Sequence, residues 1–118
     1  MKNNSKSNGT TEPRLVLQTR EGELQLIVRN IIRIGGERNY SFIYLKNEKK
    51  KLSTKTLGEL ENILGGKGFF RCHKSHLINF AHIRTNPNRS LVMLSDGSSI
   101  PIARRKKEDF KMWWESSL

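Results

Sequence analysis

The sequence predicts a mainly β domain with two short helices, and two observations lead to this fold class. Apolar residues alternate with polar ones in short runs through most of the chain, which is typical of half-buried strands. Helical periodicity occurs only in two short segments, near residues 56–64 and 108–114. At 118 residues the chain has the size of a single domain.

The first 13 residues are polar and lack apolar periodicity, so residues 1–13 are expected to form a disordered tail before a domain over residues 14–118. Alternation begins immediately afterwards. Glu21-Gly22 and Arg29-Asn30 interrupt it, which predicts short strands joined by short connections. The apolar positions of these strands are Leu15, Leu17, Leu24, Leu26, Val28, Ile32 and Ile34.

The next segment predicts two strands and then the first helix. Alternating aromatic residues at 40, 42 and 44 indicate a strand, and Asn47-Glu48 is expected to turn the chain into another at Lys49–Thr54. Thr56 and Glu59 have the spacing of a capping box, which begins a helix. Its expected buried stripe is Leu57, Leu60, Ile63 and Leu64, and Gly65-Gly66 ends it.

Extended structure returns at Phe69–Arg71 and His76–Asn79. A turn is predicted at Asn86-Pro87-Asn88, and Asp96-Gly97 between two apolar runs (91–95 and 98–102) predicts a hairpin. Residues 108–114 predict a terminal helix, with Phe110, Trp113 and Trp114 spaced for one buried face.

The charge balance indicates a polyanionic partner. Lysine and arginine number 22 against 11 acidic residues, so the formal net charge is +11 and the isoelectric point lies near 10.2. The cations gather in and around predicted turns, although basic proteins are also common for reasons of solubility. A strand-rich middle leaves no room for a helix-turn-helix, so any reading of DNA falls to loops and strand ends.

The lone cysteine, Cys72, rules out an intramolecular disulfide and fits a reducing compartment. The sequence lacks an apolar signal segment and any run long enough to span a membrane, so a cytoplasmic location with no membrane partner is expected.

Four motifs occur in an order that resembles the LytTR-type DNA-binding domain, the output module of many bacterial response regulators. The most specific is the block Phe-x-Arg-x-His-Lys-Ser-x-x-x-Asn over residues 69–79. The others are Gly-x-x-x-Tyr at 36–40, Thr-Leu-x-x-Leu at 56–60 and Pro-Ile-x-Arg-Arg at 101–105. The resemblance covers roughly residues 15–110.

This resemblance implies an elongated stack of small antiparallel sheets whose loops dock into successive major grooves of double-stranded DNA. It also implies transcription regulation through short direct repeats near promoters, and repeated half-sites favour two copies of the chain per operator. Carried over by motif, base contacts would fall to Tyr40, Lys74 and Arg105. Phosphate contacts would fall to Arg38, Ser75, Arg104 and Lys106. The chain departs from the family pattern at His76, where an aromatic is usual, and at Ala103, where a serine is common.

The side chains themselves support this division. The guanidinium of Arg105 can give two parallel hydrogen bonds to guanine, whereas Arg104 is expected to meet a phosphate because neighbours on a strand point in opposite directions. Lys74 can reach a base or a phosphate. Each residue also has an alternative without a DNA contact: Lys74 and Arg105 would be solvated surface cations, and Tyr40 would be partly buried.

Two further residues are expected to orient this region. His73 is predicted to be half-buried and bonded to backbone beside Lys74, and Asn79 is predicted to hold a turn through its side chain.

Two other functions stay open at this point. Tyr40, Phe70 and the tryptophans suggest a single-stranded nucleic-acid or RNA-binding module. The histidines at 73, 76 and 82 suggest a small metal-dependent hydrolase, which ranks last because carboxylates are scarce around them. We therefore expect a binding protein that is not an enzyme and needs no cofactor or metal. Cys72 is expected to be a small buried hydrophobe, with a redox-sensing thiol as the alternative.

Overall fold

A computed structural model of the chain describes residues 12–84 and 90–118. The predicted turn at Asn86-Pro87-Asn88 and residues 1–11 of the predicted tail lie outside these ranges. The strands are β2 (Arg14–Thr19), β3 (Gly22–Ile27), β4 (Ile31–Glu37), β5 (Tyr40–Leu45), β6 (Lys50–Ser53), β7 (Phe69–His73), β8 (His76–Asn79), β9 (Leu91–Met93) and β10 (Ser99–Pro101). The helices are α1 (Leu57–Leu64) and α2 (Lys107–Ser117), and short 3-10 turns are η1 (Val28–Asn30), η2 (Phe80–His82) and η3 (Arg104–Lys106).

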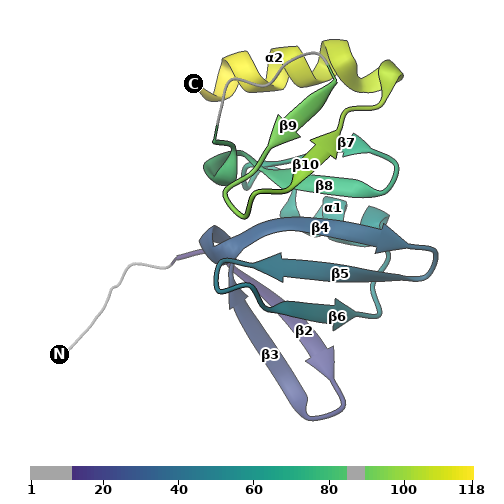
Figure 1. The fold of residues 1–118 in the computed structure, drawn as a ribbon. Helices are drawn as coiled ribbons and strands as arrows, with labels where there is room; N and C mark the ends of the chain where they lie inside the picture. Colours follow the sequence, from purple (N-terminus) through teal and green to yellow (C-terminus); the bar gives the residue numbers. More distant parts are fainter. Residues whose placement is uncertain (1–11, 85–89) are drawn as a thin grey trace, which may run out of the picture.

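The strands form a central antiparallel sheet in the order β6-β5-β4-β8-β7, flanked by the hairpins β2–β3 and β9–β10. The β2–β3 hairpin lies at one end of the molecule, and β9–β10 with α2 lies at the other (Figure 1). The molecule measures 48 × 32 × 24 Å along its principal axes. The predicted fold class is confirmed: the chain is mainly β, elongated, built of small antiparallel sheets and completed by two short α-helices.

Two hydrophobic cores lie on opposite faces of the central sheet. Ile34 and Leu77 are register partners in β4 and β8, and they pack with α1 and the β2–β3 hairpin. Ile78 belongs to the second core, with Cys72, β9–β10 and Phe110 of α2. Adjacent residues of a strand point to opposite faces, so β8 contributes to both cores and links the two ends of the molecule.

The capping box of α1 is confirmed. The Thr56 hydroxyl accepts from the Glu59 amide at 3.2 Å, and the Glu59 carboxylate accepts from the Thr56 amide at 2.8 Å. The prediction that Ile63 belongs to the buried stripe is wrong, because its side chain is 40% exposed. Successive helical residues are rotated by about 100°, so Ile63 points well away from the direction of Leu64.

Several boundaries differ from the sequence prediction. Val28 lies in η1 and not in a strand, where Asn79 donates to its carbonyl at 3.4 Å. Two residues assigned to the tail contact this turn: Glu12 pairs with Arg29, and the Pro13 carbonyl accepts from the Val28 amide at 3.0 Å. The terminal helix is longer than predicted, and η3 precedes it. No helix in the described part of the chain is long and apolar enough to cross a membrane.

Candidate nucleic-acid interface

Three connections lie along one edge of the molecule, at the right in Figure 1. They are the β4–β5 turn with Arg38 and Tyr40, the β7–β8 turn with Lys74 and Ser75, and the segment 103–106, which contains η3. We call these residues the loop edge. Backbone hydrogen bonds place the β7–β8 turn between the other two connections. The Gly36 amide donates to the Ser75 carbonyl at 2.9 Å, and the Ala103 amide donates to the Cys72 carbonyl at 2.8 Å.

Lys74 and Arg105 line the same surface hollow, although they are far apart in the sequence. Both side chains are exposed, so both are accessible from solvent. The hollow has a volume of about 420 Å³, and its lining residues are Glu61, Arg71, His73, Lys74, Ala103, Arg105 and Lys106. One ligand can therefore meet both of the cations predicted to contact bases.

The other expected phosphate contacts are distributed along the same edge. Arg104 and Arg38 are exposed, and Arg38 has a left-handed backbone with φ of 37° at the tip of the β4–β5 turn. Lys106 is half-buried, with its Nζ 5.7 Å from the centre of the Phe70 ring. With Lys74 and Arg105, these three residues give the loop edge five cations, and none of the five is in an ion pair within the described part of the chain.

The strand argument that separated Arg104 from Arg105 is wrong in its geometry. Both residues lie in η3, where consecutive side chains are rotated by about 120° around the axis and do not alternate between two faces. The two arginines still differ in surroundings, because Arg105 lines the hollow with Lys74 and Arg104 is not among its lining residues.

The β7–β8 turn is held by its own side chains. His73 is half-buried, and its Nδ1 accepts from the Ser75 amide at 3.1 Å. Arg71 donates from Nη2 to the Lys74 carbonyl at 2.7 Å. The strand register shifts between Arg71 and His73, so the regular alternation of side chains along β7 is interrupted at Cys72. Arg71 was missed as a functional candidate, and its place in the motif block was the only available signal.

Asn79 is 4% exposed, and within the described residues its side-chain hydrogen bonds go to Val28, Ile31 and Ala81 and not to this turn. Its side-chain Oδ1 accepts from the backbone amide of Ala81 at 3.1 Å, and its side-chain Nδ2 donates to the backbone carbonyl of Ile31 at 2.8 Å. Asn79 therefore holds the start of η2 against the start of β4, which supports the sheet beneath the interface.

The alternating aromatics of β5 share a face with cations. Tyr40 is 40% exposed and packs edge-on against Phe42 at 5.6 Å. Lys50 lies 4.7 Å from the Phe42 ring centre, and the guanidinium of Arg33 lies 3.7 Å from that of Tyr44. Cations therefore cover the rings of Phe42 and Tyr44, and Tyr40 is the exposed aromatic beside the loop edge.

The aromatics proposed as stacking platforms for single strands are engaged in packing. Phe70 stacks on Trp113 at 5.1 Å, and Trp114 lies 5.1 Å from Phe80. These contacts fasten α2 to the second core. The single-stranded alternative thereby loses most of the rings on which it depended.

The histidines do not converge as the hydrolase alternative requires. His82 is buried, with Nδ1 at 2.8 Å from the Ser95 hydroxyl and Nε2 at 2.8 Å from the Arg29 carbonyl. His73 and His76 lie together, with ring centres 5.3 Å apart. Within residues 12–84 and 90–118, no three side chains of the ligating types are grouped to hold a metal ion.

Cys72 is fully buried, and burial raises the pKa of its thiol to about 12. Its sulfur lies 3.5 Å from the Pro101 carbonyl. Such a thiol is almost entirely protonated at neutral pH, which is the behaviour of a small core residue and not of a redox sensor.

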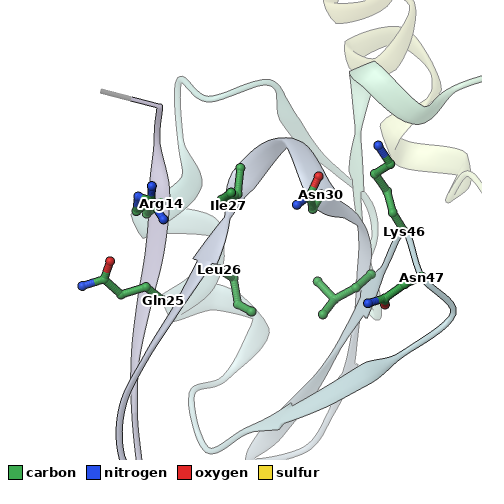
Figure 2. Close-up of a pocket in the computed structure, with 8 residues that line it drawn as sticks. Arg14, Gln25, Leu26, Ile27, Asn30, Lys46 and Asn47 are labelled. Carbon is green, nitrogen blue, oxygen red and sulfur yellow. The ribbon is translucent and has the colours of Figure 1, made fainter. Parts of the chain in front are cut away.

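A second hollow lies away from the loop edge, between the β2–β3 hairpin and the β5–β6 turn (Figure 2). It has a volume of about 380 Å³ and is lined by Arg14, Gln25, Leu26, Ile27, Asn30, Leu45, Lys46 and Asn47. Figure 2 shows Arg14 and Lys46 on opposite sides of it. Arg14 and Lys46 are the cations that line this hollow, whereas Arg71, Lys74, Arg105 and Lys106 line the hollow at the loop edge.

Comparisons with known proteins agree with this architecture. No curated protein matches the chain. Among solved structures, the LytTr DNA-binding domain of a putative methyl-accepting/DNA response regulator from Bacillus cereus superimposes with a TM-score of 0.70. The two are 19% identical, and the match covers 85% of this chain and 94% of the other, which shows a shared fold. The family model of the LytTr DNA-binding domain matches residues 22–115, and the chain therefore belongs to the LytTr DNA-binding domain family.

Proposed function

We propose that the chain binds specific sequences of double-stranded DNA by placing its loop edge in the major groove, and that it regulates transcription in bacteria. The observation that carries this proposal is the shared hollow of Lys74 and Arg105. Had these cations lain on opposite sides of the molecule, no single duplex could meet both. Membership of a DNA-binding family, rather than an enzyme family, supports the same conclusion.

The geometry suits a groove and not a flat surface. The β4–β5 turn, the β7–β8 turn and η3 project from one edge, which can follow the line of a duplex (Figure 1). The major groove of B-form DNA is about 12 Å wide, which admits a strand turn with its side chains. The loop edge consists of two strand turns and the short segment that contains η3, so we assign the reading of bases to the side chains of these connections.

Three side chains are assigned to bases. Arg105 offers a planar guanidinium that fits the O6 and N7 atoms of guanine. Lys74 projects from a turn whose backbone is braced on both sides by side chains of β7. Tyr40 presents an exposed ring and hydroxyl from the start of β5.

The remaining cations supply affinity without sequence information. Arg38, Arg104 and Lys106, with the Ser75 hydroxyl, would meet phosphates on either side of the groove. Each neutralised phosphate releases counterions. Three such cations in each of two copies on one operator make about six contacts, which imply a loss of affinity of roughly 10³ between 50 and 200 mM salt. Bending of the site would add specificity that depends on the deformability of the duplex.

The partners follow from the same family relationship. The solved relative is named as a domain of a response regulator, which favours a signal-controlled role for this chain as well. We infer direct repeats near promoters as targets, two copies of the chain per operator, and a cytoplasmic location where DNA is accessible.

The deciding experiment selects bound duplexes from a random pool and then measures affinity for the selected site, a scrambled duplex, the matching single strand and an RNA of the same sequence. We expect enrichment of a short motif and binding to the selected duplex that is at least about tenfold tighter than to the scrambled one. Equal or tighter binding to the single strand would favour the single-stranded alternative. No enrichment would refute sequence-specific reading.

A further inference from the structure

The guanidinium of Arg71 joins helix α1 to the turn that carries Lys74. Its Nη2 donates to the Lys74 carbonyl at 2.7 Å, and its Nη1 lies 3.3 Å from a carboxylate oxygen of Glu61. Glu61 lies on α1, Arg71 on β7 and Lys74 in the β7–β8 turn. One planar group therefore connects a helix, a strand and the interface loop.

This arrangement engages both ends of the guanidinium within the protein. Its two terminal nitrogens have separate acceptors, and its side chain is only 27% exposed. A lysine has a single ammonium group and lacks the planar fork that serves two acceptors at fixed positions. Arg71 is thus a cation of the motif block whose terminal nitrogens already bond to acceptors within the protein in the absence of DNA.

The anchor at the other end is rigid. α1 is fixed by the capping box at Thr56 and by its buried leucines, so Glu61 is presented from a fixed helix. On the far side of the turn, His73 accepts from the Ser75 amide and Gly36 donates to the Ser75 carbonyl. The backbone around Lys74 is consequently held from several directions, with Arg71 as the link to α1.

We propose that Arg71 is a positioning residue for DNA recognition: held by Glu61, it fixes the backbone from which Lys74 reaches the duplex. This inference rests on the proposed function, because it assigns a task to a residue of that same interface. It also gives Glu61 a purpose, since a carboxylate in a cationic hollow would otherwise only repel DNA.

A plain electrostatic role for these residues makes the opposite prediction. If Arg71 were a phosphate contact, its loss would reduce the salt slope of binding by about 0.9 and weaken all duplexes alike. If Glu61 were only a misplaced negative charge, Glu61→Gln would tighten binding to every duplex. The positioning role predicts weaker binding of the selected site from Glu61→Gln, although the hollow becomes more positive.

The experiment compares Glu61→Gln, Arg71→Lys and Arg71→Gln in the full chain, on the selected and the scrambled duplex and over a range of salt. We expect Glu61→Gln to weaken the selected site about two- to fivefold and Arg71→Lys about fivefold, with little change on the scrambled duplex. The salt slopes should stay at the wild-type value. A double variant that carries Glu61→Gln and Arg71→Lys should lose less affinity than the product of the two single losses, because both residues act through one link.

Glu115→Gln is the matched control, since it removes an exposed carboxylate of α2 that lies outside the hollow. It should not weaken the selected site. Thermal unfolding of every variant shows whether the fold is retained. Glu61 is 43% exposed on a helix surface, so its variant decides the question even where Arg71→Gln fails to fold.

A second readout does not need DNA. Nitrogen-15 relaxation of the free protein should show greater mobility of the Lys74 and Ser75 amides in Arg71→Lys and Glu61→Gln, with the β2–β3 turn unchanged. A wild-type chain that binds no duplex would refute the proposed function. The relaxation measurement alone would then test whether Glu61 and Arg71 hold the backbone at Lys74. Unchanged relaxation, or a Glu61→Gln variant that binds both duplexes more tightly, would overturn the positioning role.

Discussion

Replacing Arg105 by alanine should flatten the preference among DNA sites, whereas replacing Arg104 should weaken all sites alike. Both arginines are exposed in η3, so neither substitution removes a buried contact or disturbs a core. They differ in that Arg105 lines the hollow shared with Lys74. The pair therefore tests the division between base and phosphate contacts at nearly constant charge and stability.

The expected magnitudes separate the two variants. A two-bond arginine–guanine contact contributes about 1–3 kcal/mol of discrimination, so Arg105→Ala should reduce the affinity ratio of selected to scrambled duplex by about 5- to 150-fold. Loss of one phosphate contact at Arg104 lowers the salt slope by about 0.9. Between 50 and 200 mM salt, the deficit of Arg104→Ala relative to wild type should then shrink about 3.5-fold.

Fluorescence anisotropy titrations at several salt concentrations, on the selected and the scrambled duplex, give both quantities. Lys111→Ala serves as a control, because this exposed lysine lies on α2 and does not line the hollow. Equal losses of preference for Arg104→Ala and Arg105→Ala would refute the division of labour. If both variants kept the wild-type affinity ratio of selected to scrambled duplex, η3 would not contribute to the recognition of bases.

Three further predictions test the fold around the interface. Thr56→Ala should lower the free energy of unfolding by about 1 kcal/mol in urea denaturation because it removes the cap of α1, whereas Thr54→Ala should change it little. Burial, with the charges of neighbouring groups, lowers the pKa of His76 in the folded chain. The unfolded chain then takes up the proton first, so stability should fall as the pH drops from 7.5 to 5.5, and His76→Phe should reduce that fall; equal falls would contradict this assignment. Alkylation of the Cys72 thiol at pH 8 should be at least about a thousandfold slower in the native protein than in urea, and fast native labelling would contradict its burial.

Local patterns were sufficient wherever the structure depends on neighbours in the sequence. Alternation of apolar residues predicted the strands, because a strand that buries one face needs an apolar residue at every second position. Thr56 and Glu59 predicted the start of α1, since a capping box involves only the first turn. Asp96-Gly97 predicted the hairpin of β9 and β10, where Gly97 has φ of 86°.

Local patterns failed at the margin of a buried helix stripe, where the chain changes direction, and where two strands pair irregularly. The prediction for Ile63 missed that a short helix buries a narrower stripe than its apolar residues suggest. The prediction for Arg104 and Arg105 assumed strand geometry, and η3 replaces it. The register shift at Cys72 carries no composition signal, because a bulge is decided by how two strands pair.

The sequence by itself determined the mainly β class, the basic surface and the motif block that places the chain in its family, because these depend on residue types and short spacings. Only the tertiary structure decided that Lys74 and Arg105 share one hollow and that Arg71 is bound by Glu61 and the Lys74 carbonyl. Those relations join residues of different elements through the packing of β7 against α1 and the segment leading to η3. Packing in three dimensions is set by the whole chain, so no single stretch of sequence encodes it.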